Sequence, residues 1–153
     1  MKLEWMGQYR PLVEAYIKAA NSYARNYRQT VMTIEGVPLS AATVQVLEYI
    51  LENEEEQLPM ASLAQRLGVT RGAFSKTAAT LCSQGLVEKR HPEGGGREYI
   101  LTLTEKGRRV YGAYSETVLR LFFQPIFREL DRFTPEQLDA MQKVYQLITR
   151  QEE

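Results

Sequence analysis

The feature that most constrains the fold of this chain is a pair of short helical segments separated by only three residues. Apolar periodicity predicts helices over Met60–Leu67 and Arg71–Gln84. Between them stand Gly68, Val69 and Thr70. Glycine allows the tight turn and threonine can cap the helix that follows, so this spacing predicts a helix-turn-helix.

A β-hairpin is predicted directly after the second of these helices. The runs Leu86–Arg90 and Glu98–Leu103 contain valine, tyrosine, isoleucine and leucine, and a proline and three consecutive glycines separate them. A helix-turn-helix followed by such a hairpin is a winged helix. We expect it to lie roughly between Leu58 and Thr104.

Longer helices are predicted before this lobe. From about Gln8 to Met32, apolar and aromatic residues are spaced alternately four and three apart, which predicts one long helix that ends at Gly36 and Pro38. Ser40 is a suitable N-cap for a second helix, which we expect to end near Glu55.

Two helices are predicted after the lobe. Thr104 can cap a long helix that extends to about Leu130, with a kink expected at Pro125. Thr134 and Pro135 are typical of the start of a final helix. The predicted fold class is therefore mainly α, with a small β-hairpin wing.

Composition excludes several classes of protein. The hydrophobic content of 44% and the charged content of 25% are those of a soluble globular protein. No apolar run approaches the roughly 20 residues that cross a bilayer, and no signal peptide is recognisable, so we expect a cytoplasmic protein that contacts no membrane. One cysteine, one histidine and no convincing carboxylate pair predict no metal site, no cofactor and no enzyme.

The charge distribution points to nucleic acid although the formal net charge is zero. Between Leu58 and Arg109 nine basic residues stand against four acidic ones. The basic residues are Arg66, Arg71, Lys76, Lys89, Arg90, Arg97, Lys106, Arg108 and Arg109. An alternative interpretation, which the hairpin makes weaker, is that these are only solvated charges.

A major groove about 12 Å wide admits one helix whose outward residues are short or basic. With Phe74, Ala78 and Leu81 inward, the second short helix meets this requirement. The residues predicted to contact DNA from this helix are Thr70, Arg71, Gly72, Ser75, Lys76 and Thr80. The hairpin adds Arg90 and His91 at its base and Arg97 at its tip, where a guanidinium can enter the minor groove.

These residues carry a resemblance to a known family. Residues Met60–Gly107 are similar to the winged helix of the multiple-antibiotic-resistance regulator (MarR) family, above all in Gly85-Leu86-Val87, in Arg97 and in Leu103-Thr104-Glu105-Lys106-Gly107. The chain departs from the family at Gly95, where the family wing usually has an aspartate that precedes the arginine.

The resemblance implies a homodimeric regulator that acts as a repressor on a pseudo-palindromic operator. It implies a dimerisation helix in residues 1–39, a DNA-binding lobe in residues 40–104, and a linking helix with a second dimerisation helix in residues 105–153. Apolar stripes outside the small lobe also need a partner surface, although a single intramolecular helical core is the alternative.

In that family a small aromatic or phenolic acid often binds between the dimer helices and the lobe. The resemblance implies an effector pocket here with Arg25 or Arg28 holding the acid. Its lining would be Tyr23, Tyr27, Met32 and Tyr111. The competing interpretation is that these aromatic residues are only core residues.

Further alternatives concern single features of the sequence. The acidic residues Glu54, Glu55 and Glu56 favour a winged helix that binds another protein. A second alternative is a regulator of the phenolic-acid-response (PadR) type, which also combines a winged helix with C-terminal dimer helices. Cys82 is predicted to be a small, partly buried residue rather than an oxidant sensor, and His91 a surface or phosphate-contacting residue.

Overall fold

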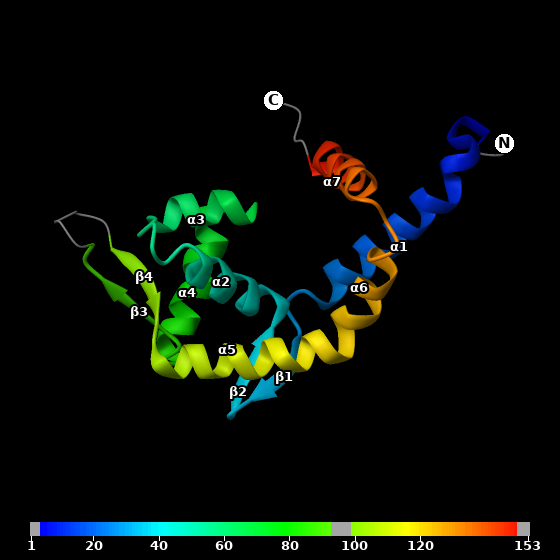
Figure 1. Ribbon diagram of the computed structural model, residues 1–153. Coiled ribbons are helices and arrows are strands. Elements are labelled where there is room, and N and C mark those ends of the chain that lie inside the picture. Colours follow the sequence, from blue (N-terminus) through cyan, green and yellow to red (C-terminus); the bar gives the residue numbers. More distant parts are fainter. Residues whose placement is uncertain (1–3, 93–98, 150–153) are drawn as a thin grey trace. The chain divides into compact units, whose positions relative to one another are not determined.

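The computed structural model describes residues 4–92 and 99–149 of the chain (Figure 1). In the N-terminal part the elements are a short 3-10 helix (Glu4–Tyr9), α1 (Arg10–Asn26), β1 (Thr30–Ile34), β2 (Val37–Ser40), α2 (Ala41–Glu52), α3 (Met60–Leu67) and α4 (Arg71–Ser83). They continue with β3 (Val87–Arg90), β4 (Ile100–Leu103), α5 (Glu105–Val118), a π-helical turn (Leu119–Phe123), α6 (Gln124–Leu130) and α7 (Pro135–Thr149).

The expected fold class is confirmed: α3 and α4 form the helix-turn-helix, and β3 pairs with β4 as an antiparallel hairpin beside them (Figure 1). The core of this winged helix includes the largest fully buried side chains of the described residues. They are Phe74, Leu39, Leu47, Ile50, Leu81, Leu86 and Val110. Burial of each such side chain stabilises the fold by about 1.5–3 kcal/mol relative to its exposure, so this core holds the lobe together.

Local signals place the helix ends where the sequence predicts them. Gly68 adopts a left-handed conformation (φ 74°) after α3, and the Thr70 hydroxyl accepts a hydrogen bond from the Ala73 amide at the start of α4. Ser40 caps α2 in a capping box with Thr43. The predicted cap residues therefore satisfy backbone groups that a helix end leaves without partners.

The predicted helix from Gln8 to Met32 is wrong in its C-terminal part. α1 ends at Asn26, and Thr30–Ile34 forms a strand that pairs with Val37–Ser40, with Met32 opposite Leu39. Pairing between strands and burial of Val37 and Leu39 override the helical spacing there. Gly36 is therefore the hairpin turn rather than the helix end.

The long helix predicted after Thr104 is interrupted before Leu130. α5 ends at Val118 and a π-helical turn (Leu119–Phe123) leads into α6. Pro125 lies in the first turn of α6. Its missing N–H and its ring disfavour a continuous α-helix, which explains a break in the preceding turn.

The chain divides into two compact units, residues 1–113 and residues 114–153, with the boundary inside α5. In the second unit α7 starts with the predicted capping box: the Thr134 amide donates to Gln137 Oε1 at 2.9 Å, and the Gln137 amide donates to Thr134 Oγ1 at 3.3 Å. Among the described residues, no helix is both long enough and apolar enough to span a membrane.

Candidate nucleic-acid interface

Helix α4 presents a mostly polar face to solvent because its large apolar residues, Phe74 and Leu81, are on the other side. Phe74, Ala78 and Leu81 are buried, as predicted. The residues predicted to contact DNA are exposed: Thr70, Arg71, Gly72, Ser75, Lys76 and Thr80. The helix thus has one face that anchors it in the lobe and one that is available to a ligand.

The N-terminus of α4 suits an anion. The first N–H groups of a helix lack partners within the helix, and the helix dipole makes this end positive. One of these N–H groups, that of Ala73, donates to Thr70 Oγ1 at 3.2 Å. Arg71 is the first residue of the helix. A phosphate at this end would meet backbone donors and a guanidinium together.

The basic residues of the lobe fall into two groups that the sequence does not distinguish. Arg66, Arg108 and Arg109 form ion pairs with glutamates of the same chain, and Lys106 Nζ donates to the Gln84 carbonyl at 2.8 Å. In the described part of the chain, Arg71, Lys76 and Lys89 take part in no ion pair. The latter three are exposed.

Lys89 was not among the residues predicted to contact DNA. It lies on β3 next to Arg90, and both side chains are exposed. The sequence signal that could have identified it is the run of three charged residues, Glu88, Lys89 and Arg90, directly after the apolar Val87. The basic surface of the lobe therefore includes the wing strand as well as α4.

At the base of the hairpin, the predicted residues Arg90 and His91 have partners of their own. Arg90 Nε donates to Glu88 Oε1 at 2.7 Å, and the His91 ring lies 4.5 Å from the Tyr99 ring. Both Arg90 and His91 are exposed. Arg97, predicted at the hairpin tip, lies outside the described residues.

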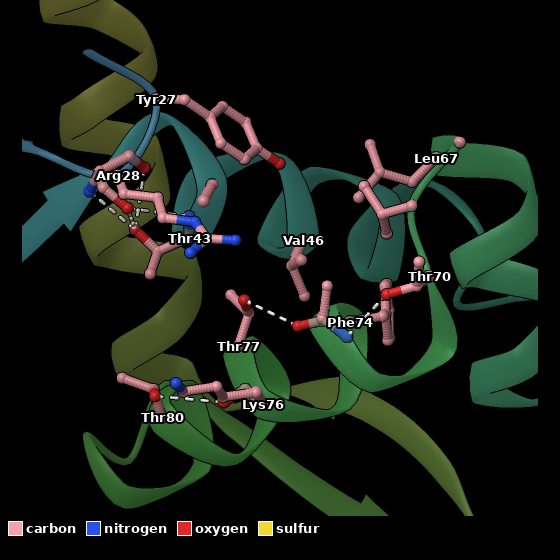
Figure 2. A pocket seen from close by; sticks show the side chains of 15 residues that line it. Tyr27, Arg28, Thr43, Val46, Leu67, Thr70, Phe74, Lys76, Thr77 and Thr80 are labelled. Carbon is pink, nitrogen blue, oxygen red and sulfur yellow. Dashed lines mark hydrogen bonds between the residues drawn. The ribbon is translucent and has the colours of Figure 1, made fainter. Parts of the chain in front are cut away.

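A cavity of about 660 Å³ opens beside α4, and Figure 2 shows it with Tyr27 and Arg28 on one side and the threonines of α4 on another. We call it the α4 groove. Its lining comprises Tyr27, Arg28, Ser40, Ala42, Thr43, Val46, Leu67, Gly68, Val69, Thr70, Ala73, Phe74, Lys76, Thr77 and Thr80. Apolar side chains and two basic residues thus share one cavity.

Of the four residues predicted for an effector pocket, only Tyr27 lines the α4 groove. Tyr23 and Tyr111 instead contact α2: the Gln45 side chain donates to the Tyr23 hydroxyl, and the Tyr111 hydroxyl donates to Glu48 Oε1 at 3.1 Å. Met32 lies on β1. Between the two candidate arginines, Arg28 lines the groove and Arg25 does not.

Partial burial changes the acidity of two groups at this face of α2. Burial raises the pKa of the Glu48 carboxyl, and the hydrogen bond from Tyr111 only partly offsets that effect. Burial also raises the pKa of the Tyr23 hydroxyl. Both groups are therefore biased toward their neutral forms.

Cys82 is partly buried near the end of α4, as predicted. Among residues 4–92 and 99–149, no group of three or more histidine, cysteine, aspartate or glutamate side chains could hold a metal ion.

Comparison with known proteins supports the winged-helix interpretation. Residues 36–98 match the model of the MarR family. An uncharacterised protein of Mycobacterium tuberculosis is 38% identical over 65 residues, which are 42% of this chain and 46% of that protein. The match thus spans about half the length of the curated relative.

Solved structures are similar over nearly the whole chain. Sco3205, a MarR family transcriptional regulator from Streptomyces coelicolor in complex with DNA, has a TM-score of 0.68 and 23% identity, and the match covers 91% of this chain and 84% of that one. The PcaV transcriptional regulator from Streptomyces coelicolor, in complex with its natural ligand, has a TM-score of 0.60 and 16% identity, with coverage of 94% and 93%. At these identities the likeness establishes the fold.

Proposed function

We propose that this chain is a transcriptional regulator of the MarR family, whose model matches residues 36–98, and that it binds double-stranded DNA sequence-specifically as a homodimer. The observation that carries the proposal is the outward face of α4, where Arg71 and Lys76 are exposed without ion-pair partners in the described part of the chain. A helix with such a face can enter a major groove and contact phosphates and base edges.

Two copies of the lobe would read two half-sites. Apolar side chains are exposed in residues 114–153, including Leu121, Phe122 and Leu147, and a second copy of the chain would cover them. A two-fold dimer places its recognition helices about one DNA turn apart, so the proposed operator is pseudo-palindromic. Occupancy of an operator that overlaps a promoter would repress transcription.

The test of DNA binding is fluorescence anisotropy with a duplex from the upstream region of the gene and with a scrambled duplex, over a series of salt concentrations. We expect tighter binding to the first duplex, and an affinity that falls steeply with salt. Replacing a phosphate-binding residue, as in Lys76→Ala, should lower the salt slope by about one. Lys18→Ala, an exposed lysine of α1 paired with Glu14, is the matched control.

Equal binding to both duplexes would show that the operator does not lie in this upstream duplex. A selection from random duplexes would then test whether the protein prefers any sequence. If no selected sequence were bound in preference to others, the proposal of sequence-specific binding would fail. Repression is tested separately by transcription in vitro from the same promoter, with and without the protein. Unchanged or increased transcription on operator binding would contradict it.

Arg97 is proposed to contact the minor groove despite Gly95. We expect Arg97→Ala to weaken selective binding, because the negative potential of a narrow minor groove attracts a guanidinium. If Arg97→Ala leaves selective binding unchanged, the regulator function is supported and the minor-groove contact of Arg97 is excluded.

We further propose that the α4 groove binds a small aromatic or phenolic acid that releases DNA. The groove combines apolar side chains such as Val46 and Phe74 with Arg28 and Lys76, a combination that suits an aromatic ring with a carboxylate. Lys76 also belongs to the proposed DNA-contacting face. An acid bound there would neutralise a cation that DNA requires, and would therefore favour the free protein.

The probe for this site is 4-hydroxybenzoate, titrated into the protein by calorimetry and into the protein–DNA complex by anisotropy. Arg28→Leu should abolish both effects, whereas Arg25→Leu, whose side chain does not line the groove, should leave them unchanged. Release of DNA that depends on Arg25 rather than Arg28 would place the effector elsewhere.

The alternative proposal is a winged helix that binds another protein through its acidic turn. The turn is a poor candidate because Glu54 and Glu56 are already paired with Arg108 and Arg66. The observation that would favour it is weak DNA binding at all salt concentrations.

A further inference from the structure

The acidic turn of residues 54–56 follows α2 and lies between the helix-turn-helix and the wing. Its three glutamates differ in their surroundings. Glu54 contacts β4 and α5, Glu56 contacts α3, and Glu55 is exposed, without an ion pair in the described part of the chain. Their positions in the fold give these neighbouring residues different roles.

Glu54 binds an edge of the wing that β3 does not cover. The Thr104 amide donates to the Leu86 carbonyl at 3.0 Å on the β3 side. Because N–H groups of successive residues in a strand point to opposite sides, the Leu103 amide points away from β3. It donates instead to Glu54 Oε1 at 3.0 Å.

The same edge has a backbone bridge three residues earlier, where Pro59 forms an isolated antiparallel bridge with Ile100. The Glu54 carboxylate therefore takes the place that a strand carbonyl would have beside Leu103. Leu103 is 5% exposed, so water is a poor substitute for this acceptor.

The second carboxylate oxygen of Glu54 is used as well. Arg108, in the first turns of α5, donates from Nη2 to Glu54 Oε2. The Glu54 side chain is 20% exposed. One carboxylate, which accepts at both oxygens, thus joins the wing strand and the start of α5.

The residues on either side of Glu54 connect it to the helix-turn-helix. Arg66 of α3 donates to the Asn53 side chain and, from Nη2, to Glu56 Oε2 at 2.8 Å. Asn53 is buried, and its Nδ2 donates to the Tyr49 carbonyl at 2.7 Å. The turn is therefore held by α2 and α3 on one side and holds β4 and α5 on the other.

We propose that Glu54 is a positioning residue that fixes the wing and the start of α5 against the helix-turn-helix, and so sets the relative placement of the two DNA-contacting elements, α4 and the wing. Its consequence for DNA binding rests on the proposed function. Glu54 does not itself contact DNA in this proposal. It acts through the amide of Leu103 and the guanidinium of Arg108.

The first measurement is hydrogen exchange of the Leu103 amide in full-length protein. Glu54→Leu removes both acceptors, Glu54→Gln keeps one neutral acceptor, and Glu55→Leu and Glu55→Gln are the matched controls. Exchange at Leu103 should be about tenfold faster in Glu54→Leu, the factor that corresponds to the loss of one typical hydrogen bond. The Glu55 variants should match the unchanged protein.

The second measurement separates positioning from general stability. Glu54→Leu should weaken DNA binding by roughly tenfold at a temperature at which circular dichroism shows it folded. This loss should shrink when Arg90→Ala has already weakened the wing, and should remain in full when Lys76→Ala has weakened α4. If Glu54→Leu does not fold, Glu54→Gln carries the same comparison with a smaller effect.

Unchanged Leu103 exchange in both Glu54 variants would overturn the proposal. So would a loss of DNA affinity that adds equally to Arg90→Ala and Lys76→Ala. If the unchanged protein shows no sequence preference, the proposed function fails, and the exchange measurement alone decides whether Glu54 fixes the wing.

Discussion

Among the glycines that the structure describes, Gly107 has the least room for a side chain. It lies in the first turn of α5 with its Cα against the backbone of Leu86, and a Cβ there would come within 2.0 Å of the Leu86 carbonyl oxygen. Thr104 ties the same two segments together, because its hydroxyl donates to the Gly85 carbonyl at 2.7 Å. The segment between α4 and β3 is thus in close backbone contact with the start of α5.

We expect Gly107→Ala to lower the free energy of unfolding by about 1–3 kcal/mol, because backbone must move to admit the methyl group. Gly112→Ala in the same helix is the control. Its added Cβ meets nothing within 4 Å, so the better helix propensity of alanine should raise stability by up to about 1 kcal/mol. Urea denaturation measures both, and equal stabilities would contradict the packing argument.

Glu48 gives the stability of the lobe a dependence on pH. Burial raises the pKa of its carboxyl above the ordinary value of 4.5, so the folded chain binds this proton more tightly than the unfolded chain does. Its contribution to stability is therefore full below the ordinary value and is lost as pH rises through the raised pKa.

Glu48→Gln removes that dependence while keeping an acceptor for the Tyr111 hydroxyl. Relative to the variant, the unchanged protein should lose stability between acidic and neutral pH, as followed by urea unfolding at a series of pH values. Glu55→Gln, at an exposed carboxylate, controls for the loss of one negative charge. A constant difference between the unchanged protein and Glu48→Gln would refute the assignment.

At the scale of the element, the β1–β2 hairpin depends on a turn with positive φ at both central residues. Ile34 pairs with Val37, so only Glu35 and Gly36 connect the strands, with φ angles of 50° and 76°. Positive φ at both central residues is the type I′ turn, whose twist suits a two-residue hairpin. Glycine adopts this conformation without strain, whereas glutamate does so at a cost.

Gly36→Ala should destabilise the chain by about 1–2 kcal/mol, because a Cβ is strained at this φ. Glu35→Asn should instead stabilise it slightly, since asparagine accepts left-handed backbone more readily. The ion pair between Glu35 and Arg109 is long at 3.8 Å and exposed, so its loss should matter little. Chemical denaturation of both variants tests the turn. An unchanged free energy of unfolding in Gly36→Ala would exclude the type I′ turn.

At the scale of the whole molecule, the exposed apolar side chains argue for assembly. Leu121, Phe122 and Leu147 are each more than 60% exposed in the second unit, and Leu12 is 67% exposed on α1. Soluble monomers rarely leave such groups of side chains in contact with water.

We expect light scattering after gel filtration to give the mass of two chains. The double substitution Leu121→Glu and Phe122→Glu should shift the protein toward one chain, because buried carboxylates without partners oppose association. Tyr99→Glu changes an exposed aromatic residue of the wing and should leave the mass unchanged. A monomer at all concentrations would reject the proposed homodimer.

Much of the candidate interface could be predicted because the division of α4 into two faces depends on helical spacing alone. Phe74, Ala78 and Leu81 recur at the intervals of one buried stripe, so the exposed positions follow. The sequence could not show which cations are free. Arg108 pairs with Glu54 across 54 positions, and no local pattern reports such a contact.

The sequence by itself determined the helix-turn-helix, the hairpin that follows it, and the helix caps at Ser40, Thr70 and Thr134, because these depend on residues a few positions apart. Only the tertiary structure decided that Met32 lies in a strand and that Glu54 contacts the Leu103 amide. Strand pairing and buried polar contacts take their free energy from groups that the fold brings together. Spacing along the chain therefore cannot predict them.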